Sequence, residues 1–206
     1  MILESLPTGP LQVNCYILGC EVTRQAAVID PGGDVPQILA LLKQHDLQLQ
    51  LVINTHGHFD HIGGNRQLLA ATGAELLLHQ ADSTLLASAA KHAAAFGMQT
   101  DMSPAPQRLL NGGEQLALGE LLIDVLHTPG HTPGGICLLI EDQVIVGDTL
   151  FAGSIGRTDL PGGDHQTLIN SIREKLLILP DATVAHPGHG PSTSIGREKS
   201  YNPFLS

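Results

Sequence analysis

The sequence predicts a mixed α/β fold, and three observations support this prediction. The chain has 206 residues, which is close to the usual size of one domain. Hydrophobic residues make up 42% of it, enough to build a folded core. Short apolar runs alternate with amphipathic segments in both halves of the chain. This recurring order favours two sheets packed face to face with helices outside.

In the first half, strands are expected where short apolar runs end at turn residues. Helices are expected where apolar residues recur at helical spacing, and Asp34 is expected to cap the first of them. The expected strands are Ile2–Leu6, Val13–Leu18, Ala26–Ile29, Leu49–Asn54 and Glu75–Leu78, and the expected helices are Val35–His45, Gly63–Thr72 and Ser83–Phe96.

The second half follows a loop with two prolines, Thr100–Pro106, and strands dominate its beginning. A glycine-rich stretch, Gly153–Gly163, precedes its one expected helix, Thr167–Ile178. The expected strands are Gln115–Leu118, Leu121–Leu126, Ile136–Ile140, Val144–Val146 and Thr183–Ala185.

The charge balance excludes several classes of partner. Twenty acidic and ten basic residues give a net charge of −10. A nucleic-acid-binding protein needs a basic face, and anionic lipid attracts polybasic segments, so we expect neither nucleic acid nor a membrane as a partner. The first residues lack the basic region of a signal peptide, which favours the cytoplasm. The three cysteines, Cys15, Cys20 and Cys137, have no CxxC spacing and are expected to be buried thiols.

Three of the eleven histidines fall within one short motif, Thr55–His61, which follows an expected buried strand. Within it, His56, His58, Asp60 and His61 offer the nitrogen and oxygen ligands that suit zinc or iron. The spacing differs from the i, i+4 pair of a helical metal site, so we expect a tight loop. In such a loop His56 and His58 point to one side, and Asp60 and His61 point to another. The motif can therefore hold two metals.

Three further candidate ligands lie in turns rich in glycine or proline. They are His131, Asp148 and His189, and each follows an expected strand. Strand ends can present side chains to a common site, so these residues can supply the ligands that the first motif lacks.

Together, these motifs resemble the metallo-β-lactamase superfamily. Within it the chain is most similar to the short bacterial proteins of the glyoxalase II type, the hydroxyacylglutathione hydrolases. The resemblance extends from the Asp30-Pro31-Gly32-Gly33 segment to the closing Asn202-Pro203-Phe204-Leu205 segment. It implies a four-layer αβ/βα sandwich with the metal site at the edge between two sheets.

The resemblance also implies a set of metal ligands. It assigns one divalent ion to His56, His58 and His131, and a second ion to Asp60, His61 and His189. Asp148 would bridge the two ions. Zinc is the expected metal, with iron and manganese as alternatives.

The implied activity is hydrolysis of a thioester, S-D-lactoylglutathione, to D-lactate and glutathione. Two cations about 3.5–4 Å apart lower the pKa of a bridging water, and the resulting hydroxide attacks the carbonyl carbon. Asp60 is the expected catalytic residue because it would orient this hydroxide. The leaving thiolate has a reference pKa of about 8.5 and needs no strong general acid.

For several residues around the expected site, the sequence allows two different roles. Asp30 either supports the ligand motif, as the resemblance implies, or is an acid of a helix-entry turn. Arg157 and Asp159 stand where the family has a lysine and a tyrosine, and Pro191 replaces another tyrosine. Arg157 either binds a substrate carboxylate or pairs with Asp159. His127 and His186 are expected either to support ligands or to lie in the core.

The expected organisation is a single domain over residues 1–206 that acts on a small acyl thioester. The longer glyoxalase II enzymes add a helical C-terminal domain that binds glutathione, and we expect none here. An alternative activity is an iron-dependent persulfide dioxygenase, whose single iron would use His56, His131 and Asp148. Those enzymes share a segment like Gly156–Asp159. The remaining hypotheses are a lactonase and a non-catalytic metal-binding domain.

Overall fold

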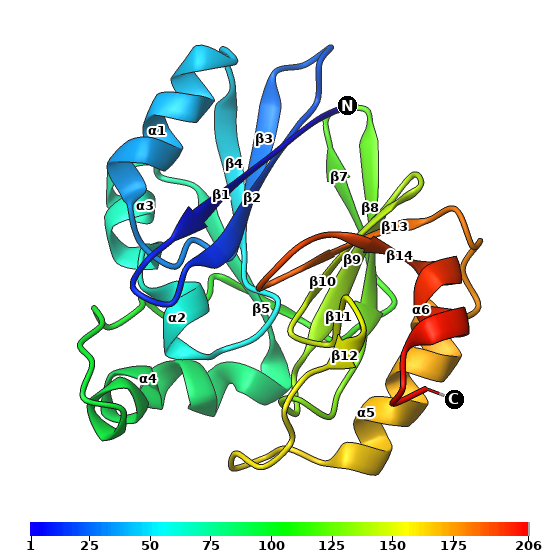
Figure 1. The fold of residues 1–206 in the computed structure, drawn as a ribbon. Helices are drawn as coiled ribbons and strands as arrows, with labels where there is room; N and C mark the ends of the chain where they lie inside the picture. The colour runs from blue at the N-terminus through cyan, green and yellow to red at the C-terminus, as the bar shows by residue number, and fades with distance from the viewer. Residues whose placement is uncertain (206) are drawn as a thin grey trace. The chain divides into compact units, whose positions relative to one another are not determined.

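The computed structural model describes residues 1–205, which form two compact units. The first unit comprises Met1–Leu110 and Ala117–Leu121, and the second comprises Asn111–Leu116 and the chain from Leu122 onward. Each unit is built on a six-stranded sheet with helices packed against it (Figure 1). The predicted mixed α/β class is therefore confirmed.

The first unit contains a sheet with the strand order β1-β2-β3-β4-β5-β6. Strands β1, β2 and β3 pair antiparallel, whereas β3, β4, β5 and β6 run parallel to one another. The strands are β1 (Ile2–Thr8), β2 (Val13–Gly19), β3 (Gln25–Ile29), β4 (Gln48–Ile53), β5 (Glu75–His79) and β6 (Arg108–Leu110). The sequence pattern predicted all of them except the short edge strand β6.

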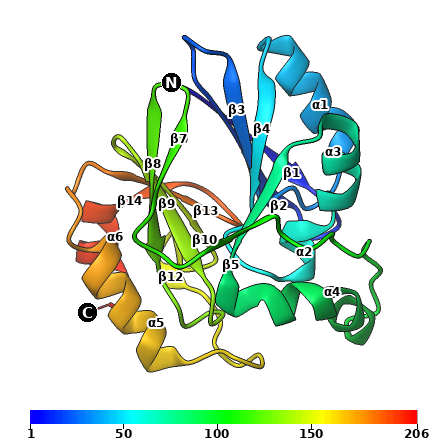
Figure 2. The ribbon, with the colours of Figure 1, turned by 180° about the vertical axis from the view of Figure 1, so that it is seen from behind.

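Two helices, α1 (Val35–Gln44) and α3 (Asn65–Thr72), lie together along this sheet in both ribbon views (Figure 1 and Figure 2). Ile38 of α1 and Leu68 of α3 are fully buried, and they pack with Val28 of β3 in one apolar cluster. Burial of this apolar face is the main stabilising contribution of the two helices.

The predicted N-cap position of α1 is confirmed, but the Asp34 side chain does not form the capping hydrogen bond. Asp34 does occupy the N-cap position, but its φ is 49° and its side chain makes no capping hydrogen bond. Its Oδ2 instead accepts a hydrogen bond from the backbone N–H of Gly9, at 2.8 Å. The carboxylate therefore connects two turns of the chain.

The helical segment predicted at Gly63–Thr72 begins later, at Asn65, and a separate turn, α2 (Phe59–Ile62), precedes it. The two are divided where the backbone N–H of Gly64 donates to the carbonyl of Pro31, at 2.7 Å. After β5, a 3₁₀ turn, η1 (Gln80–Asp82), leads into α4 (Ser83–Ala95). Apolar residues of α2, β5 and α4 form a second cluster, Ile62, Leu78, Leu86 and Ala89.

The second sheet has the order β14-β13-β10-β9-β8-β7, and it belongs to the second unit except for the end of β7 and the first residue of β8. Strand β9 is antiparallel to both β8 and β10, and β10 is parallel to β13, so β8, β10 and β13 share one direction. The strands are β7 (Gln115–Leu118), β8 (Leu121–His127), β9 (Ile136–Ile140), β10 (Gln143–Gly147), β13 (Val184–Pro187) and β14 (Thr193–Ser194). A small separate hairpin pairs β11 (Leu150–Phe151) with β12 (Ser154–Ile155).

Helical segments α5 (His165–Ser171), η2 (Ile172–Leu176) and α6 (Ile195–Tyr201) pack on this second sheet. The segment η2 is a π-helical turn that directly continues α5, so the predicted helix at Thr167–Ile178 is largely present. The sequence pattern did not predict α6, β14 or the β11–β12 hairpin.

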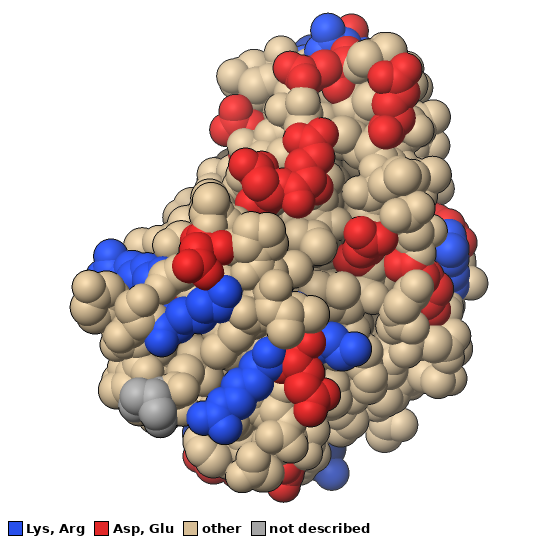
Figure 3. Space-filling view, turned by 90° about the vertical axis from the view of Figure 1, so that its right-hand side faces the viewer, with Lys and Arg blue, Asp and Glu red and all other residues tan. Residues whose placement is uncertain are grey.

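The side of the second unit that carries α5 and α6 bears charges of both signs. In Figure 3, Lys and Arg gather in the lower part of the view, with Asp and Glu among them. The exposed cations of η2 and α6 are Arg173, Lys175, Arg197 and Lys199. Lys199 forms an ion pair with Asp181, with Nζ and Oδ1 2.6 Å apart.

Two further predictions concern the cysteines and the membrane. All three cysteines are free and buried, as predicted. Among the helices of residues 1–205, none combines the length and the apolar character that crossing a bilayer would need.

Candidate metal centre

The candidate ligands of the first unit follow the carboxyl end of a parallel strand. Strands β3, β4 and β5 run in one direction, so the segments that follow them begin at the same edge of the sheet. This is the edge at which open α/β sheets usually bind ligands. Asp30 follows β3, the segment Thr55–His61 (the ligand loop) follows β4, and Asp82 comes shortly after β5.

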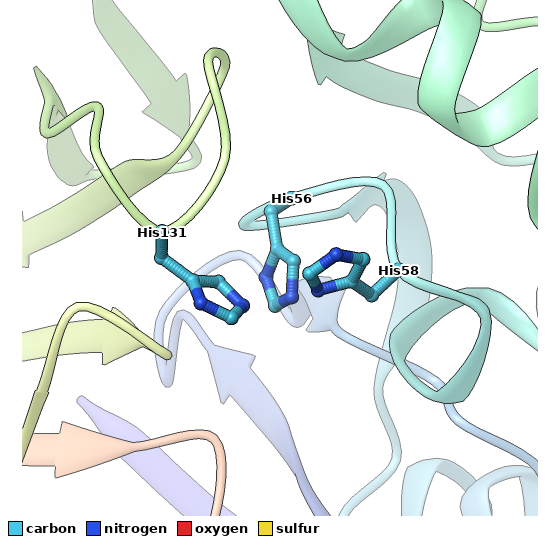
Figure 4. Close-up of side chains that lie close together, drawn as sticks. All are labelled: His56, His58 and His131. Carbon is cyan, nitrogen blue, oxygen red and sulfur yellow. The ribbon is translucent and has the colours of Figure 1, made fainter. Parts of the chain in front are cut away.

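The three histidines of the ligand loop form one cluster. The ring centroids of His56 and His58 lie 4.7 Å apart in an edge-to-face arrangement, and Figure 4 shows these two rings side by side. The His61 ring lies 4.1 Å from that of His56. The ligand nitrogen of His56 lies within 4.8 Å of those of His58 and His61.

The predicted pairs are present, since His56 groups with His58 and Asp60 groups with His61, but the two pairs also lie close to each other. His56 and His58 do lie in irregular backbone, but Asp60 and His61 belong to the helical turn α2. The turn returns the chain toward His56, which explains why His56 and His61 are neighbours. Nε2 of His61 lies 3.8 Å from Oδ2 of Asp60, so these two side chains form a pair of potential ligands.

Asp30 makes several hydrogen bonds to the ligand loop. Its Oδ1 accepts from the backbone N–H of Thr55 at 2.7 Å, and its Oδ2 accepts from the Thr55 hydroxyl at 2.6 Å. The same Oδ2 lies 2.9 Å from Nδ1 of His61. All three residues are buried. A carboxylate that holds Nδ1–H leaves Nε2 of His61 as the nitrogen that faces Asp60, which is the usual arrangement behind a metal-binding histidine.

Asn54 also holds the ligand loop, and the sequence reasoning missed it. Its side-chain amide donates to the carbonyl of His61 at 3.2 Å and therefore connects the two ends of the motif. Asn65 donates in turn to Oδ1 of Asn54 at 2.7 Å. A polar residue at the end of an otherwise apolar strand was the available sequence signal, since a buried amide requires partners.

In the second unit the candidate ligands also follow strands of one direction. His131 comes after β8, Asp148 after β10 and His189 after β13. Oδ2 of Asp148 lies 3.7 Å from Nε2 of His131 and 3.9 Å from Nε2 of His189. One carboxylate oxygen therefore lies within reach of both imidazoles, as a shared ligand would.

Backbone groups orient His131 and connect the loops of the second unit. Nδ1 of His131 lies 2.8 Å from the carbonyl oxygen of Arg157, and Figure 4 shows His131 at the end of its own loop. The N–H of Gly188 donates to the carbonyl of Gly147 at 2.7 Å, which connects the His189 loop to the Asp148 loop. A Cβ atom at Gly156 would collide with the carbonyl of Asp148, so only glycine allows this close approach.

Two further histidines brace these loops. Nε2 of His127 lies 3.0 Å from the carbonyl oxygen of Pro133, at the other end of the loop that carries His131. His186 lies between Ser192 and Gln143, at 3.0 and 2.7 Å, and so spans the loop that carries His189. Burial lowers the pKa of His186, which favours its neutral form.

A buried group of hydroxyls and a thiol lies behind the same loops. The Thr128 hydroxyl is 3.2 Å from the Thr149 hydroxyl and 3.3 Å from Sγ of Cys137. Cys137 also approaches the carbonyl of Val146 at 3.7 Å, and burial raises the pKa of its thiol to about 11. Thr149 follows Asp148 directly, so this network supports one ligand loop from within the core.

The guanidinium of Arg157 forms two hydrogen bonds with Asp159. Its Nε lies 2.7 Å from Oδ1, and its second nitrogen lies 2.8 Å from Oδ2. The guanidinium lowers the pKa of Asp159 to about 2. The structure therefore contains the pairing that was one of the two alternatives for Arg157, and its side chain is still 54% exposed.

Within each unit, the donor atoms fit a divalent cation. Imidazole nitrogens and carboxylate oxygens bind such ions at about 2.0–2.2 Å, so two ligand atoms less than about 4 Å apart can reach the same ion. The pairs between Asp60 and His61, Asp148 and His131, and Asp148 and His189 meet this condition, at 3.8, 3.7 and 3.9 Å. Nitrogen and oxygen ligands of this kind accept zinc, iron or manganese.

The chain belongs to the metallo-β-lactamase superfamily. The family model described as "Metallo-beta-lactamase superfamily" matches residues 8–189, a span that contains every candidate ligand. The protein is thus a member of a superfamily of metallo-hydrolases, with a cluster of His and Asp residues in each unit that suits divalent metals.

Three similar proteins place the chain more closely. It is 40% identical over 210 residues to the "Hydroxyacylglutathione hydrolase GloC" of Haemophilus influenzae, covering 100% of this chain and 99% of that protein. It matches the crystal structure of "BLEG-1 B3 metallo-beta-lactamase" with a TM-score of 0.93 and 36% identity, over 100% of both chains. It matches "TTHA1623 in a di-iron-bound form" with a TM-score of 0.91 and 40% identity, over 98% of this chain and 100% of the other. These matches establish the fold. The first two names refer to different substrates, and the third refers only to bound iron.

Proposed function

We propose that this protein is a metal-dependent thioester hydrolase that converts S-D-lactoylglutathione, or a related small acyl thioester, to the free acid and thiol. One observation carries the proposal. Asp60 in the first unit and Asp148 in the second each direct Oδ2 to within 3.9 Å of an imidazole Nε2. The similarity to a relative named as a hydroxyacylglutathione hydrolase supports this choice of substrate.

In this proposal the chain holds two divalent cations, with zinc as the expected metal and iron or manganese as alternatives. Asp148 is the shared ligand. The ligands of one cation are His56, His58 and His131, and those of the other are Asp60, His61 and His189. When bound, two such cations acidify a water molecule and polarise a carbonyl group.

The side chains of the protein have separate roles in this reaction. Asp60 orients the attacking water by accepting a hydrogen bond from it. Asp30 holds the Nδ1–H of His61, which keeps Nε2 directed toward the Asp60 carboxylate. The leaving thiolate needs no strong general acid, because its reference pKa is about 8.5.

Arg157 is the proposed contact for a carboxylate of the substrate. The ion pair with Asp159 holds its guanidinium in one orientation, and the exposed side of this planar group can bind a second carboxylate. This contact would supply positive charge for an anionic thioester in a protein whose net charge is −10.

The test is elemental analysis of freshly purified protein, combined with a thiol-release assay on S-D-lactoylglutathione. We expect two metal equivalents per chain and hydrolysis that a chelator abolishes. His58→Ala should reduce the rate by about 100-fold or more, on the scale of removing one strong electrostatic group. The exposed His165 provides the control, since His165→Ala should leave the rate unchanged. A metal-loaded protein that leaves the thioester intact would rule out this function.

A second candidate is an iron-dependent persulfide dioxygenase. The position of Gly156–Asp159 favours it, because the Arg157 carbonyl in this segment accepts from His131. Its single iron would use His56, His131 and Asp148. Oxygen uptake with glutathione persulfide would support this activity, whereas a colourless two-zinc protein would count against it. The same protein should also be assayed for hydrolysis of a lactone and of a β-lactam.

A further inference from the structure

A second buried carboxylate, besides Asp30, reaches the ligand loop. Asp82 ends the 3₁₀ turn η1 and is fully buried, with 0% of its surface exposed. It comes three residues after β5, and β5 pairs parallel to β4, the strand that precedes the ligand loop. The parallel pairing therefore explains how a residue 25 positions from Gly57 arrives beside it.

The Asp82 side chain is not used to cap its own helix. Asp82 occupies the N-cap position of α4, where an aspartate normally accepts a hydrogen bond from the second or third backbone N–H of the helix. Here the carboxylate makes no such bond. Its Oδ2 instead accepts from the backbone N–H of Gly57, at 2.9 Å. The residue type that best starts a helix thus acts on a neighbouring loop.

Gly57 lies between His56 and His58, so the bond fixes the turn that separates two candidate ligands. The start of α4 packs closely against this turn. A Cβ atom at Gly57 would lie 3.0 Å from the backbone nitrogen of Leu86 and 3.1 Å from the carbonyl oxygen of Asp82. The backbone of the turn at Gly57 therefore packs directly against the backbone at the start of α4, so the turn has little room to move away from the Asp82 carboxylate.

The ligand loop is consequently held by two carboxylates at different points. Asp30 holds Thr55 and His61, at the two ends of the loop, and Asp82 holds Gly57 between them. Hydrogen bonds to an ionised acceptor are shorter and stronger than neutral ones. A buried carboxylate also favours a cation nearby, because the low dielectric of the interior strengthens their attraction.

We propose that Asp82 is a positioning residue of the metal centre, which holds the backbone between His56 and His58 in the conformation that binds a cation. The inference rests on the metal site of the proposed function, but it concerns metal affinity and not the substrate. Asp82 has no contact with the reacting atoms in this proposal and acts through Gly57.

The experiment measures zinc binding to the metal-free protein by competition with a chromophoric chelator. Asp82→Ala removes the hydrogen bond and the charge, and it should weaken zinc binding by about 10- to 100-fold, the usual effect of losing a group that orients metal ligands. Asp82→Asn keeps an oxygen that can accept from Gly57 and removes the charge. It should therefore restore part of the affinity lost in Asp82→Ala.

Glu198 of the second unit provides a matched control. It is 1% exposed, and its Oε2 accepts from the backbone N–H of Gly153 at 2.9 Å, so its burial and its bond closely resemble those of Asp82. Its carboxylate also accepts from the Thr193 hydroxyl and the Asn202 amide, and neither residue is a candidate ligand. Glu198→Ala should lower thermal stability and leave zinc affinity within about twofold of the parent, because this carboxylate holds no ligand loop.

Amide hydrogen exchange of the metal-free protein provides a second readout. Exchange of the Gly57 amide should be faster in Asp82→Ala than in the parent, and Asp82→Asn should lie between them. If Asp82→Ala does not fold, Asp82→Asn is compared with the control variant Glu198→Gln. Asp82→Asn should then weaken zinc binding more than Glu198→Gln does.

Two results would overturn the proposal. One is a zinc affinity of Asp82→Ala within twofold of the parent. The other is an equal loss of affinity in the Glu198 variant at the same loss of thermal stability. If the parent protein binds no zinc, iron or manganese, the proposed metal site itself is refuted. That outcome is distinct from the two results that refute the role of Asp82.

Discussion

In the first unit, buried carboxylates hold the candidate ligands, whereas neutral groups hold them in the second unit. Nδ1 of His61 lies against the Asp30 carboxylate, but Nδ1 of His131 lies against the Arg157 backbone carbonyl. Behind the second set of loops lie the hydroxyl of Thr128 and the thiol of Cys137. A candidate imidazole ligand is thus oriented by a charged carboxylate in the first unit and by a neutral backbone carbonyl in the second unit.

The difference follows from how the ligands are distributed along the chain. Four of them fall within one loop in the first unit, and their backbone must be held in a single compact conformation. In the second unit each ligand has its own strand end, and backbone hydrogen bonds such as Gly188 to Gly147 already align the loops. A compact ligand loop therefore needs strong side-chain acceptors, while a dispersed set depends on the sheet.

The largest effect is expected at Asp30. Asp30→Asn keeps a side chain that tolerates the positive φ of 52°, but it removes the charge and turns an amide toward His61 and Thr55. It should lower the free energy of unfolding of the metal-free protein by about 3 kcal/mol, measured by urea denaturation.

Asp34 is the control for Asp30, since it has a similar φ of 49° and one bond to Gly9. Asp34→Asn should cause a much smaller loss, because Asp34 is exposed. Equal losses in the two variants would contradict the claim that burial and charge make Asp30 a special support.

A smaller effect is expected in the neutral network of the second unit. Thr128→Val and Thr149→Val should each cost about 1 kcal/mol of unfolding free energy, as a lost neutral hydrogen bond does. The double variant should cost less than the sum of the two, because the hydroxyls lie 3.2 Å apart and share a bond. Additive losses in urea denaturation would show that the two hydroxyls act separately.

The pH dependence of stability distinguishes the histidine environments further. Burial lowers the pKa of His186, so the unfolded chain binds this proton more readily than the folded chain. The stability contributed by neutral His186 should be complete above about pH 6.5 and should decline as the pH falls below that value. His186→Gln stays neutral, so its unfolding free energy should decline less on acidification. Parallel curves for the parent and the variant would show that this residue does not contribute.

The smallest effect on the free energy of unfolding is expected for the exposed ion pair between Arg157 and Asp159, so this pair is tested through the pKa of Asp159. Arg157→Ala keeps the backbone carbonyl that accepts from His131, but it removes the guanidinium that lowers the pKa of Asp159 to about 2. NMR titration should show this pKa rising toward the ordinary value for aspartate, about 3.9. An unchanged pKa would mean that the ion pair is not maintained in solution.

The sequence predicted those parts of the site that depend on local pattern. The motif Thr55–His61 and the turns with His131, Asp148 and His189 were recognisable because ligand residue types occur there beside glycine or proline at expected strand ends. Most strands were recognisable for the same reason, since a short apolar run between turn residues is a local signal.

The parts that the sequence did not predict depend on contacts between distant segments. Asp82 reaches Gly57 only because β5 pairs parallel to β4, which no local pattern specifies. Asp34 has the right residue type and position for a cap, yet its carboxylate binds Gly9 instead. Helix α6 was missed because Ile195 is its one buried apolar residue, which leaves no helical periodicity to detect.

The shared direction of β8, β10 and β13 has a practical consequence for labelling the protein. Because Asp148 follows the end of β10, the turn at Glu141 and Asp142 lies at the opposite end of this strand. Five residues of strand, about 17 Å, separate the turn from the ligand loop. Both turn residues are exposed. A fluorophore or a short tag inserted there would report on the protein without crowding its ligands.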